Sequence, residues 1–316
     1  MLSRYCEWES PLNGIEVPED WKRLASKIQE RKGTVMVIGA PDTGKTTLTQ
    51  FLVRELCNRG EAVAYIDGDI GQSTLGPPTT QGLAVFDSPY TRLEEGTDRS
   101  HYFVGSVSPR GHGLETVVGL KRLLDRSQAV RDRIAILDTT GYVVGEDALE
   151  LKYQKMDLLD PCHIVAVQRR GEIEPILKAR EGREKTVVHR LPASALVQTR
   201  SQEERRRYRW SRFKNYFKTL LLHRVDLRRT SLTGTHKIRI HDRREADMEG
   251  LLLGLNGPDN FLVALGLLEM VNPARGTLSC LVPPTPDLER ARTIRLGSIR
   301  IDLSEETNGE RFLRYD

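Results

Sequence analysis

Short apolar runs alternate with longer amphipathic stretches through the first two thirds of the chain. The runs VMVI, AVAYID, RIAILD, HIVAVQ and KTVVHRL predict buried strands, because each is short and rich in apolar residues. The stretches between them, such as GEDALELKYQKMDLL and EIEPILKAREG, predict helices. Strands that alternate with helices predict an α/β fold with a mostly parallel sheet covered on both faces. The ligand site is then expected at the carboxyl ends of the strands.

The pattern changes after residue 200. The segment RSQEERRRYRWSRFKNYF predicts a charged helix, and beyond it short apolar runs are separated by Asn-Gly, Pro and Asp. These runs, HKIRIHD, GLLLGLNGPDNFLVALGLLEMV, GTLSCLV and TIRLGSIRIDL, predict a small all-β domain at the C-terminus. We therefore expect an α/β domain in residues 1–222, including an Arg-rich segment at about 198–217, and a β-rich domain in residues 223–316.

Composition adds limits to this picture. A length of 316 residues is enough for two domains, and a formal net charge of +4 permits a polyanionic partner without indicating one. Four cysteines stand far apart and form no metal-ligand pair, which favours a reducing compartment and no zinc site: Cys6, Cys57, Cys162 and Cys280. Because the sequence shows no signal peptide and no apolar run of about 18 residues, we expect a soluble, cytoplasmic protein without membrane association.

The segment GAPDTGKTT follows a predicted strand and opens a predicted helix, which is the context of a phosphate-binding loop, or P-loop. Its glycines let backbone N–H groups turn toward phosphate oxygens, and the helix N-terminus adds positive potential. Lys45 would neutralise charge on the β- and γ-phosphates, and the Thr46 hydroxyl would bind Mg²⁺. The nucleotide-binding residues that the segment predicts are Gly39, Ala40, Pro41, Asp42, Thr43, Gly44, Lys45, Thr46 and Thr47.

Carboxylates follow two of the predicted strands. Asp67 and Asp69 stand where AVAYID ends, beside the phosphate loop in this fold class, where they can bind magnesium or accept a proton from an attacking hydroxyl. Asp69 is our candidate for the general base and for a metal ligand, with Asp67 and Gln72 in support; the alternative is an ordinary polar turn. Asp138 ends the run RIAILD and has the form of the magnesium-associated carboxylate of many P-loop proteins.

Two loops offer contacts for a substrate. In DTTGYV, Thr140 supplies a hydroxyl and Tyr142 a ring that can stack on a nucleic-acid base, or else simply pack against protein. In YFVGSVSPRGH, Ser106 and Ser108 stand among glycines, and such a loop can bind substrate phosphates or be an ordinary surface turn.

The charged helix carries Arg205, Arg209 and Arg212 on one face, where like charges repel unless an anion lies across them. A transferring phosphoryl group is such an anion, and a mobile lid that brings arginine onto it is a recurrent device in phosphoryl transfer. The alternative is a solvated charged face, with aromatic residues on the side that packs.

In order and spacing, these segments resemble the polynucleotide 5′-hydroxyl kinases related to the kinase subunit of eukaryotic pre-mRNA 3′-end processing and to the ribosomal-RNA processing kinases. The resemblance rests on GAPDTGKTT, DGDIGQS, GSVSP, DTTGYV and RRRYRWSRFKNYF. The runs EGLLLGLNGPDNFLVALGLLEMV and IRLGSIRI extend it over most of the chain. Many unrelated enzymes share the phosphate loop, whereas its combination with DGDIGQS and the Arg-rich helix is specific.

The resemblance implies transfer of the γ-phosphoryl group of ATP to the 5′-hydroxyl end of RNA or DNA, with Mg²⁺. By position it implies that Lys45 binds phosphate, Thr46 binds the metal ion and Asp69 is the general base. It further implies that Gln72 supports the site and that Arg205 and Arg209 are the lid residues. The family usually has an aromatic residue, often Trp, at the position of Tyr142 and uses it against the terminal base; Tyr offers a smaller stacking face. Eukaryotic members carry a β domain before the phosphate loop, whereas only 38 residues precede Gly39 here, so we expect a free-standing monomer or small oligomer and assign no protein partner.

Two other functions are compatible with the sequence. One is an ATP-binding scaffold that recruits RNA-processing partners without turnover, and the other is a P-loop kinase of a small molecule. Intact Lys45, Thr46 and Asp69 argue against the scaffold. The GSVSP loop, Tyr142 and the basic helix favour a polymeric substrate.

Overall fold

The computed structural model describes residues 17–87, 93–128, 133–234, 248–303 and 313–315. The chain forms two compact units, each assembled from several segments. The first comprises Met1–Leu75, Gln81–Ser100 and Pro109–Arg200, and the second comprises Gly76–Thr80, His101–Ser108 and Ser201–Asp316. The boundary expected near residue 222 stays a prediction, and the predicted strand HKIRIHD lies outside the described residues.

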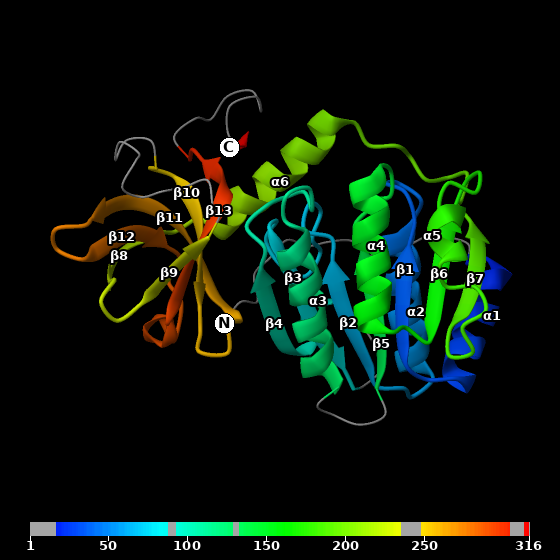
Figure 1. The fold of residues 1–316 in the computed structure, drawn as a ribbon. Helices are drawn as coiled ribbons and strands as arrows, with labels where there is room; N and C mark the ends of the chain where they lie inside the picture. The colour runs from blue at the N-terminus through cyan, green and yellow to red at the C-terminus, as the bar shows by residue number, and fades with distance from the viewer. Residues whose placement is uncertain (1–16, 88–92, 129–132, 235–247, 304–312, 316) are drawn as a thin grey trace. The chain divides into compact units, whose positions relative to one another are not determined.

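A seven-stranded sheet with the order β4-β3-β2-β5-β1-β6-β7 carries the first unit (Figure 1). Its strands are β1 (Thr34–Ile38), β2 (Val63–Gly68), β3 (Thr80–Phe86), β4 (Thr97–Phe103), β5 (Ile134–Thr139), β6 (His163–Gln168) and β7 (Val187–Pro192). Neighbours from β2 to β7 pair in parallel, whereas β3 is antiparallel to β2. The predicted α/β fold with a mostly parallel sheet is confirmed, and β3 and β4 are additions that the apolar pattern had not predicted.

Helices cover both faces of this sheet. They are α1 (Glu19–Glu30), α2 (Lys45–Asn58), α3 (Gly113–Gln128), α4 (Glu146–Leu159) and the short α5 (Glu174–Lys178), with a 3₁₀ turn, η1, at Leu93–Glu95. Val35 and Val37 of β1 pack with α1 and α2, whereas Met36 and Ile38 pack with α4 and α5. Figure 1 shows α3 and α4 in front of the sheet and α1 and α2 behind it. Successive strand side chains point to opposite faces, so an unbroken apolar run is buried on both.

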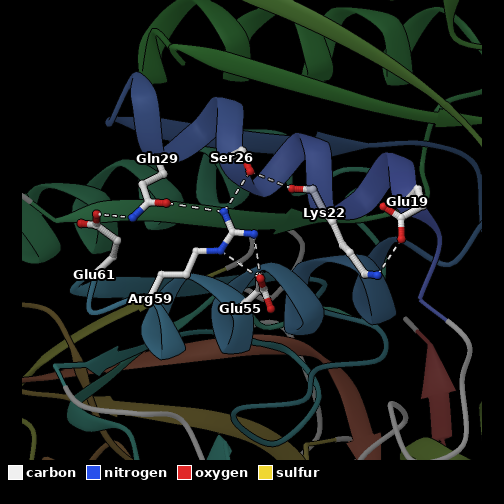
Figure 2. Close-up of polar contacts among 7 residues, drawn as sticks. All are labelled: Glu19, Lys22, Ser26, Gln29, Glu55, Arg59 and Glu61. Carbon is white, nitrogen blue, oxygen red and sulfur yellow. Dashed lines mark hydrogen bonds and ion pairs between the residues drawn. The ribbon is translucent and has the colours of Figure 1, made fainter.

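A polar seam joins α1 to α2 (Figure 2). Arg59, at the end of α2, donates to Glu55 Oε1 of its own helix at 2.9 and 2.7 Å and to the Ser26 hydroxyl of α1 at 3.0 Å. Gln29 of α1 donates to Glu61 Oε1 at 3.0 Å. The seam therefore fixes how α1 lies on the helix that starts at the phosphate loop.

The second unit contains a seven-stranded sheet. Six strands have the order β14-β13-β10-β11-β12-β8, and the seventh, β9, pairs in parallel with β13. Its strands are β8 (Leu221–Asp226), β9 (Ser231–Gly234), β10 (Leu251–Asn256), β11 (Leu262–Asn272), β12 (Thr277–Val282), β13 (Thr293–Ile301) and β14 (Leu313–Tyr315), with a 3₁₀ turn, η3, at Leu288–Arg290. The other pairs are antiparallel. The predicted β-rich region toward the C-terminus is confirmed.

Helix α6 (Gln202–Tyr216) belongs to this second unit. It begins with a capping box, in which the Glu204 N–H donates to the Ser201 hydroxyl at 3.1 Å and the Ser201 N–H donates to Glu204 Oε2 at 2.6 Å. Phe213 and Phe217 lie in the core beside Leu252 of β10. The aromatic side of the predicted charged helix is therefore its packed side.

Two of the compositional expectations concern the described residues directly. Cys57, Cys162 and Cys280 are free thiols, and Cys6 lies outside the described ranges. In the part of the chain that the structure describes, every helix is too short or too polar to cross a bilayer.

Candidate active site

The phosphate loop runs from the end of β1 at Ile38 to the start of α2 at Lys45. Gly44 caps α2 in a left-handed conformation with a φ of 87°, which glycine adopts without strain. Lys45 is buried, and its Nζ donates to the Ala40 carbonyl at 2.7 Å, so the ammonium lies over the loop backbone. The first N–H groups of α2 have no carbonyl partner within the helix, and this makes the helix start an anion-binding end.

Thr46 and Asp138 come together although 92 residues separate them. The Thr46 hydroxyl donates to Asp138 Oδ2 at 2.6 Å, while Asp138 Oδ1 is buried without a hydrogen-bond partner among the described residues. Burial raises the pKa of Asp138 to about 7, although the nearby Lys45 ammonium opposes the shift. An unmatched buried carboxylate oxygen beside a hydroxyl is a donor set that fits a hard divalent cation, which also relieves the cost of burying the charge.

The described residues contain no group of three or more His, Cys, Asp or Glu side chains arranged to hold a metal ion. Mg²⁺ in phosphoryl-transfer sites usually takes one or two carboxylates and completes its shell with water and phosphate oxygens. Asp138 and Thr46 match the protein's part of such a shell.

Asp67 and Asp69 lie two residues apart in different environments. Asp67, at the end of β2, is 1% exposed. Its Oδ2 accepts from the Ser73 hydroxyl at 2.9 Å, from the Thr74 N–H at 2.6 Å and hydroxyl at 3.0 Å, and from the Leu75 N–H at 3.1 Å. Burial raises the pKa of Asp67 and the Asp69 carboxylate acts in the same direction, whereas backbone N–H donors oppose both. This carboxylate shapes the segment that follows β2.

Asp69 lies one residue beyond the end of β2 and is partly exposed. Its Oδ1 accepts from the N–H groups of Gly71 and Gln72 at 3.0 and 3.1 Å, which orients the carboxylate. Its charge raises the pKa values of both Asp67 and Asp138, so all three carboxylates share one electrostatic neighbourhood with Lys45. Of these two carboxylates, Asp69 is the one with solvent-accessible surface, and its role as general base stays a prediction.

Two arginines that the sequence analysis did not single out contact the phosphate loop. The Arg200 N–H donates to Asp42 Oδ2 at 3.1 Å, and Arg200 Nη1 donates to Gln72 Oε1 at 2.9 Å. The Arg169 guanidinium, just after β6, donates to the carbonyls of Pro41, at 3.4 Å, and Asp42. These partners are 127 to 158 residues away in sequence, and no local pattern signals the contacts.

The turn after β5 lies against the phosphate loop. A Cβ built on Gly141 would lie 2.7 Å from the Pro41 nitrogen, so only glycine allows this approach. Thr140 is buried, and its hydroxyl has no hydrogen-bond partner within the described ranges. Tyr142 is partly exposed and hydrogen bonds with Arg110, and this contact raises the pKa of the Arg110 guanidinium.

The remaining predicted substrate residues belong to the second unit. Ser106 is buried and its hydroxyl accepts the Ser108 N–H at 3.2 Å, which is the pattern of a local turn. Arg205 and Arg209 of α6 are partly exposed, whereas Arg212 is buried and donates to the Gly76 carbonyl at 2.8 Å. Arg212 therefore serves the structure of this unit, and Arg205 and Arg209 stay the predicted lid residues.

The family model described as "mRNA cleavage and polyadenylation factor CLP1 P-loop" matches residues 39–219. A polyribonucleotide 5′-hydroxyl-kinase of Pyrococcus horikoshii is 31% identical, over 90% of this chain and 91% of the relative. One of Thermococcus kodakarensis is 32% identical, over 95% and 97%. The polyribonucleotide 5′-hydroxyl-kinase Clp1 of Bos taurus is 28% identical, over 65% of this chain and 50% of that protein.

Among solved structures, a chain of the Clp1p–Pcf11p complex superposes with a TM-score of 0.67 at 15% identity, covering 89% of this chain and 79% of that chain. This likeness concerns the fold. Together with the family match and the archaeal relatives, it confirms the resemblance that the motifs indicated: the chain belongs to the CLP1 P-loop family of polynucleotide kinases.

Proposed function

We propose that this protein is an ATP-dependent polynucleotide kinase, which transfers the γ-phosphoryl group to the 5′-hydroxyl end of RNA or DNA. Its archaeal relatives carry the name polyribonucleotide 5′-hydroxyl-kinase and match it over nearly their whole length. The observation that carries the proposal is the convergence of a phosphate loop with a partly exposed carboxylate, Asp69, and a buried carboxylate–hydroxyl pair, Asp138 and Thr46.

Each of these groups has a distinct role in the proposed reaction. Lys45 and the N–H groups at the start of α2 bind the β- and γ-phosphates. Asp69 accepts the proton of the 5′-hydroxyl as its oxygen attacks the γ-phosphorus, the bond from that phosphorus to the bridging oxygen breaks, and ADP leaves. A Mg²⁺ ion, when bound by Thr46 and Asp138 or Asp69, would neutralise charge on the phosphate oxygens.

Gln72 and Arg200 give the carboxylate segment a defined position. Because Arg200 joins Gln72 to Asp42, it connects the segment after β2 to the phosphate loop. We propose that Arg200 acts with Arg205 and Arg209, which follow it in the chain, to stabilise charge on the transferring group.

We propose that polar and aromatic side chains, of the kinds that proteins commonly use to bind nucleic acids, bind the acceptor strand. Tyr142 offers a partly exposed ring for stacking on the terminal base, and Thr140 lies beside it in the turn after β5. We assign backbone phosphates to Ser106 and Ser108.

The test is incubation of the protein with γ-labelled ATP, Mg²⁺ and a 5′-hydroxyl oligonucleotide, with an otherwise identical 5′-phosphorylated oligonucleotide as the control. We expect label on the first oligonucleotide and none on the second. Tight ATP binding without transfer would instead support the scaffold, and transfer to a small hydroxyl compound but not to oligonucleotides would support the small-molecule kinase.

A further inference from the structure

Helix α4 carries two lysines on its inward face that the proposed reaction does not use. Lys152 and Lys155 both have 0% of their surface exposed. Lysine is seldom fully buried, because desolvating an ammonium is costly unless it finds hydrogen-bond partners. The two differ in this respect, although they lie one helical turn apart.

The Lys152 Nζ donates to the Thr139 hydroxyl at 2.8 Å and to the Thr140 carbonyl at 2.7 Å. The Thr139 hydroxyl in turn donates to the Val37 carbonyl at 2.7 Å. Two hydrogen bonds therefore link α4 to the end of β5 and the residue after it, and a third continues from Thr139 to β1 near the start of the phosphate loop. By contrast, Lys155 Nζ has no hydrogen-bond partner among the described residues.

The turn after β5, which Lys152 contacts, adjoins the phosphate loop and the Asp138 carboxylate. Asp138, which pairs with Thr46, directly precedes Thr139, and Gly141 follows with no space for even a methyl group between it and Pro41 of the phosphate loop. A small rotation of this turn would move the Asp138 carboxylate and the Thr140–Tyr142 segment together. Phosphoryl transfer depends on such positions, and a misplacement of about 1 Å can cost about a hundredfold in rate.

The burial of Lys152 also affects its pKa. Burial lowers the pKa of Lys152 well below its ordinary value, and the positive charges of Lys155 and Lys45 act in the same direction, whereas the Asp69 and Asp138 carboxylates oppose the shift. The Thr139 hydroxyl and the Thr140 carbonyl accept N–H bonds from the amine in either protonation state, so the link does not depend on its charge.

We propose that Lys152 is a positioning residue of the phosphoryl-transfer site, which holds the turn after β5 against the phosphate loop through the Thr139 hydroxyl and the Thr140 carbonyl. The inference rests on the proposed kinase function for its consequence, but the hydrogen-bonded link has its own structural readout. Lys155 has the same chemistry and the same burial on the same helix, and it serves as the matched control.

The experiment compares Lys152→Met with Lys155→Met, because methionine keeps an unbranched chain and removes the amine. At a temperature well below both unfolding midpoints, with saturating ATP and oligonucleotide, Lys152→Met should lower kcat by roughly tenfold to a hundredfold, with KM for ATP changed less than about threefold. Lys155→Met removes an amine whose charge also interacts with Asp69 but breaks no hydrogen bond of the described residues, so it should lower kcat by a clearly smaller factor than Lys152→Met. Equal kcat values for the two variants would overturn the proposal.

Hydrogen–deuterium exchange provides the readout that does not depend on turnover. The amides of Thr140, Gly141 and Tyr142 should exchange faster in Lys152→Met than in the parent, and at the parent rate in Lys155→Met. If the parent protein shows no kinase activity but exchange is faster in Lys152→Met, the link is upheld and the proposed function is rejected. If the parent is an active kinase but exchange is unchanged in Lys152→Met, the link alone is rejected.

Thr139→Val provides a second route if Lys152→Met does not fold. Valine preserves the side-chain shape and removes the hydroxyl that relays Lys152 to Val37, so it should lower kcat by a similar factor. Where both single variants fold, the Lys152→Met/Thr139→Val double variant should lose little more than either alone, because the two changes break one chain. A Thr139→Val enzyme within about twofold of the parent kcat would overturn the proposal.

Discussion

The phosphate loop and helix α6 both present positive charge, and the chain holds that charge in different ways. Lys45 is 6% exposed and bonded to the loop backbone, with buried carboxylates nearby. Arg205 and Arg209 are partly exposed on a helix whose anchorage comes from the core residues Phe213 and Phe217 and from Arg212. The first is a site built into the ends of the strands, whereas the second is a charged helix face attached to a separate core.

The difference indicates where each kind of residue should act. A buried ammonium is preorganised and contributes already when the nucleotide binds, whereas a charge on a partly exposed helix contributes most when a transition state brings more negative charge to it. We therefore expect loss of the phosphate-loop charge to affect binding and rate together, and loss of α6 charge to affect mainly the rate.

The largest effect is expected from Lys45→Ala. This change removes the charge that the loop is built around, so transfer should fall below detection and ATP binding should weaken sharply. Labelled transfer and titration with a fluorescent ATP analogue measure the two effects. Full turnover by this variant would show that the buried charge is not the nucleotide site.

Asp69→Asn should have the next largest effect, because a general base typically contributes about a hundredfold to ten-thousandfold in rate. ATP binding should change little. The matched change is Asp67→Asn, which puts an amide where several hydrogen bonds converge and should cost about 1–3 kcal/mol of folding free energy. Chemical denaturation and steady-state kinetics on both variants separate the roles. A stable, inactive Asp67→Asn beside an active Asp69→Asn would exchange them.

Arg205→Ala and Arg209→Ala should each lower the saturated turnover rate by about tenfold or more, with smaller changes in oligonucleotide affinity. Lysine at either position should rescue the rate only in part, since it lacks the planar fork that spans two oxygens. If α6 only follows the nucleic-acid backbone, the alanine variants will instead weaken oligonucleotide binding, flatten its salt dependence and keep the saturated rate.

The smallest effect is expected at the α1–α2 seam. Arg59→Met keeps the aliphatic stem and removes the bonds to Glu55 and Ser26, so it should cost about 1 kcal/mol in unfolding free energy. The rate should stay at the parent value, because the seam lies at the far end of α2 from Lys45. A slower enzyme of unchanged stability would mean that the phosphate loop depends on α1 as well as on its own backbone.

Local sequence patterns were sufficient to predict where the phosphate loop and its neighbouring carboxylates lie, but they did not predict the long-range contacts of the arginines. The phosphate loop and Asp69 follow apolar strands and Asp138 is the last but one residue of another, so short segments placed them at one sheet edge. The pattern could not tell which of Asp67 and Asp69 is buried, because that depends on how residues 73–75 fold back onto the strand end.

Long-range contacts account for the residues that were missed. Arg200 looks like the first charge of a basic segment, yet its partners are Asp42 and Gln72. Lysines in an amphipathic helix usually mark its solvated face, so α4 gave no indication that Lys152 lies inside. Strands β3 and β4 were missed because no helix separates them, and the strand–helix alternation is interrupted there.

The second unit is completed by two short stretches from the first half of the chain. Phe103, from one of them, fills its core so closely that a Cβ on Gly254 would meet the ring at 2.4 Å. A gene starting at residue 201 would therefore encode this β-rich core without one of its aromatic rings. The boundary of the β-rich unit in space therefore corresponds to no single cut in the gene, because residues 76–80 and 101–108 belong to that unit as well.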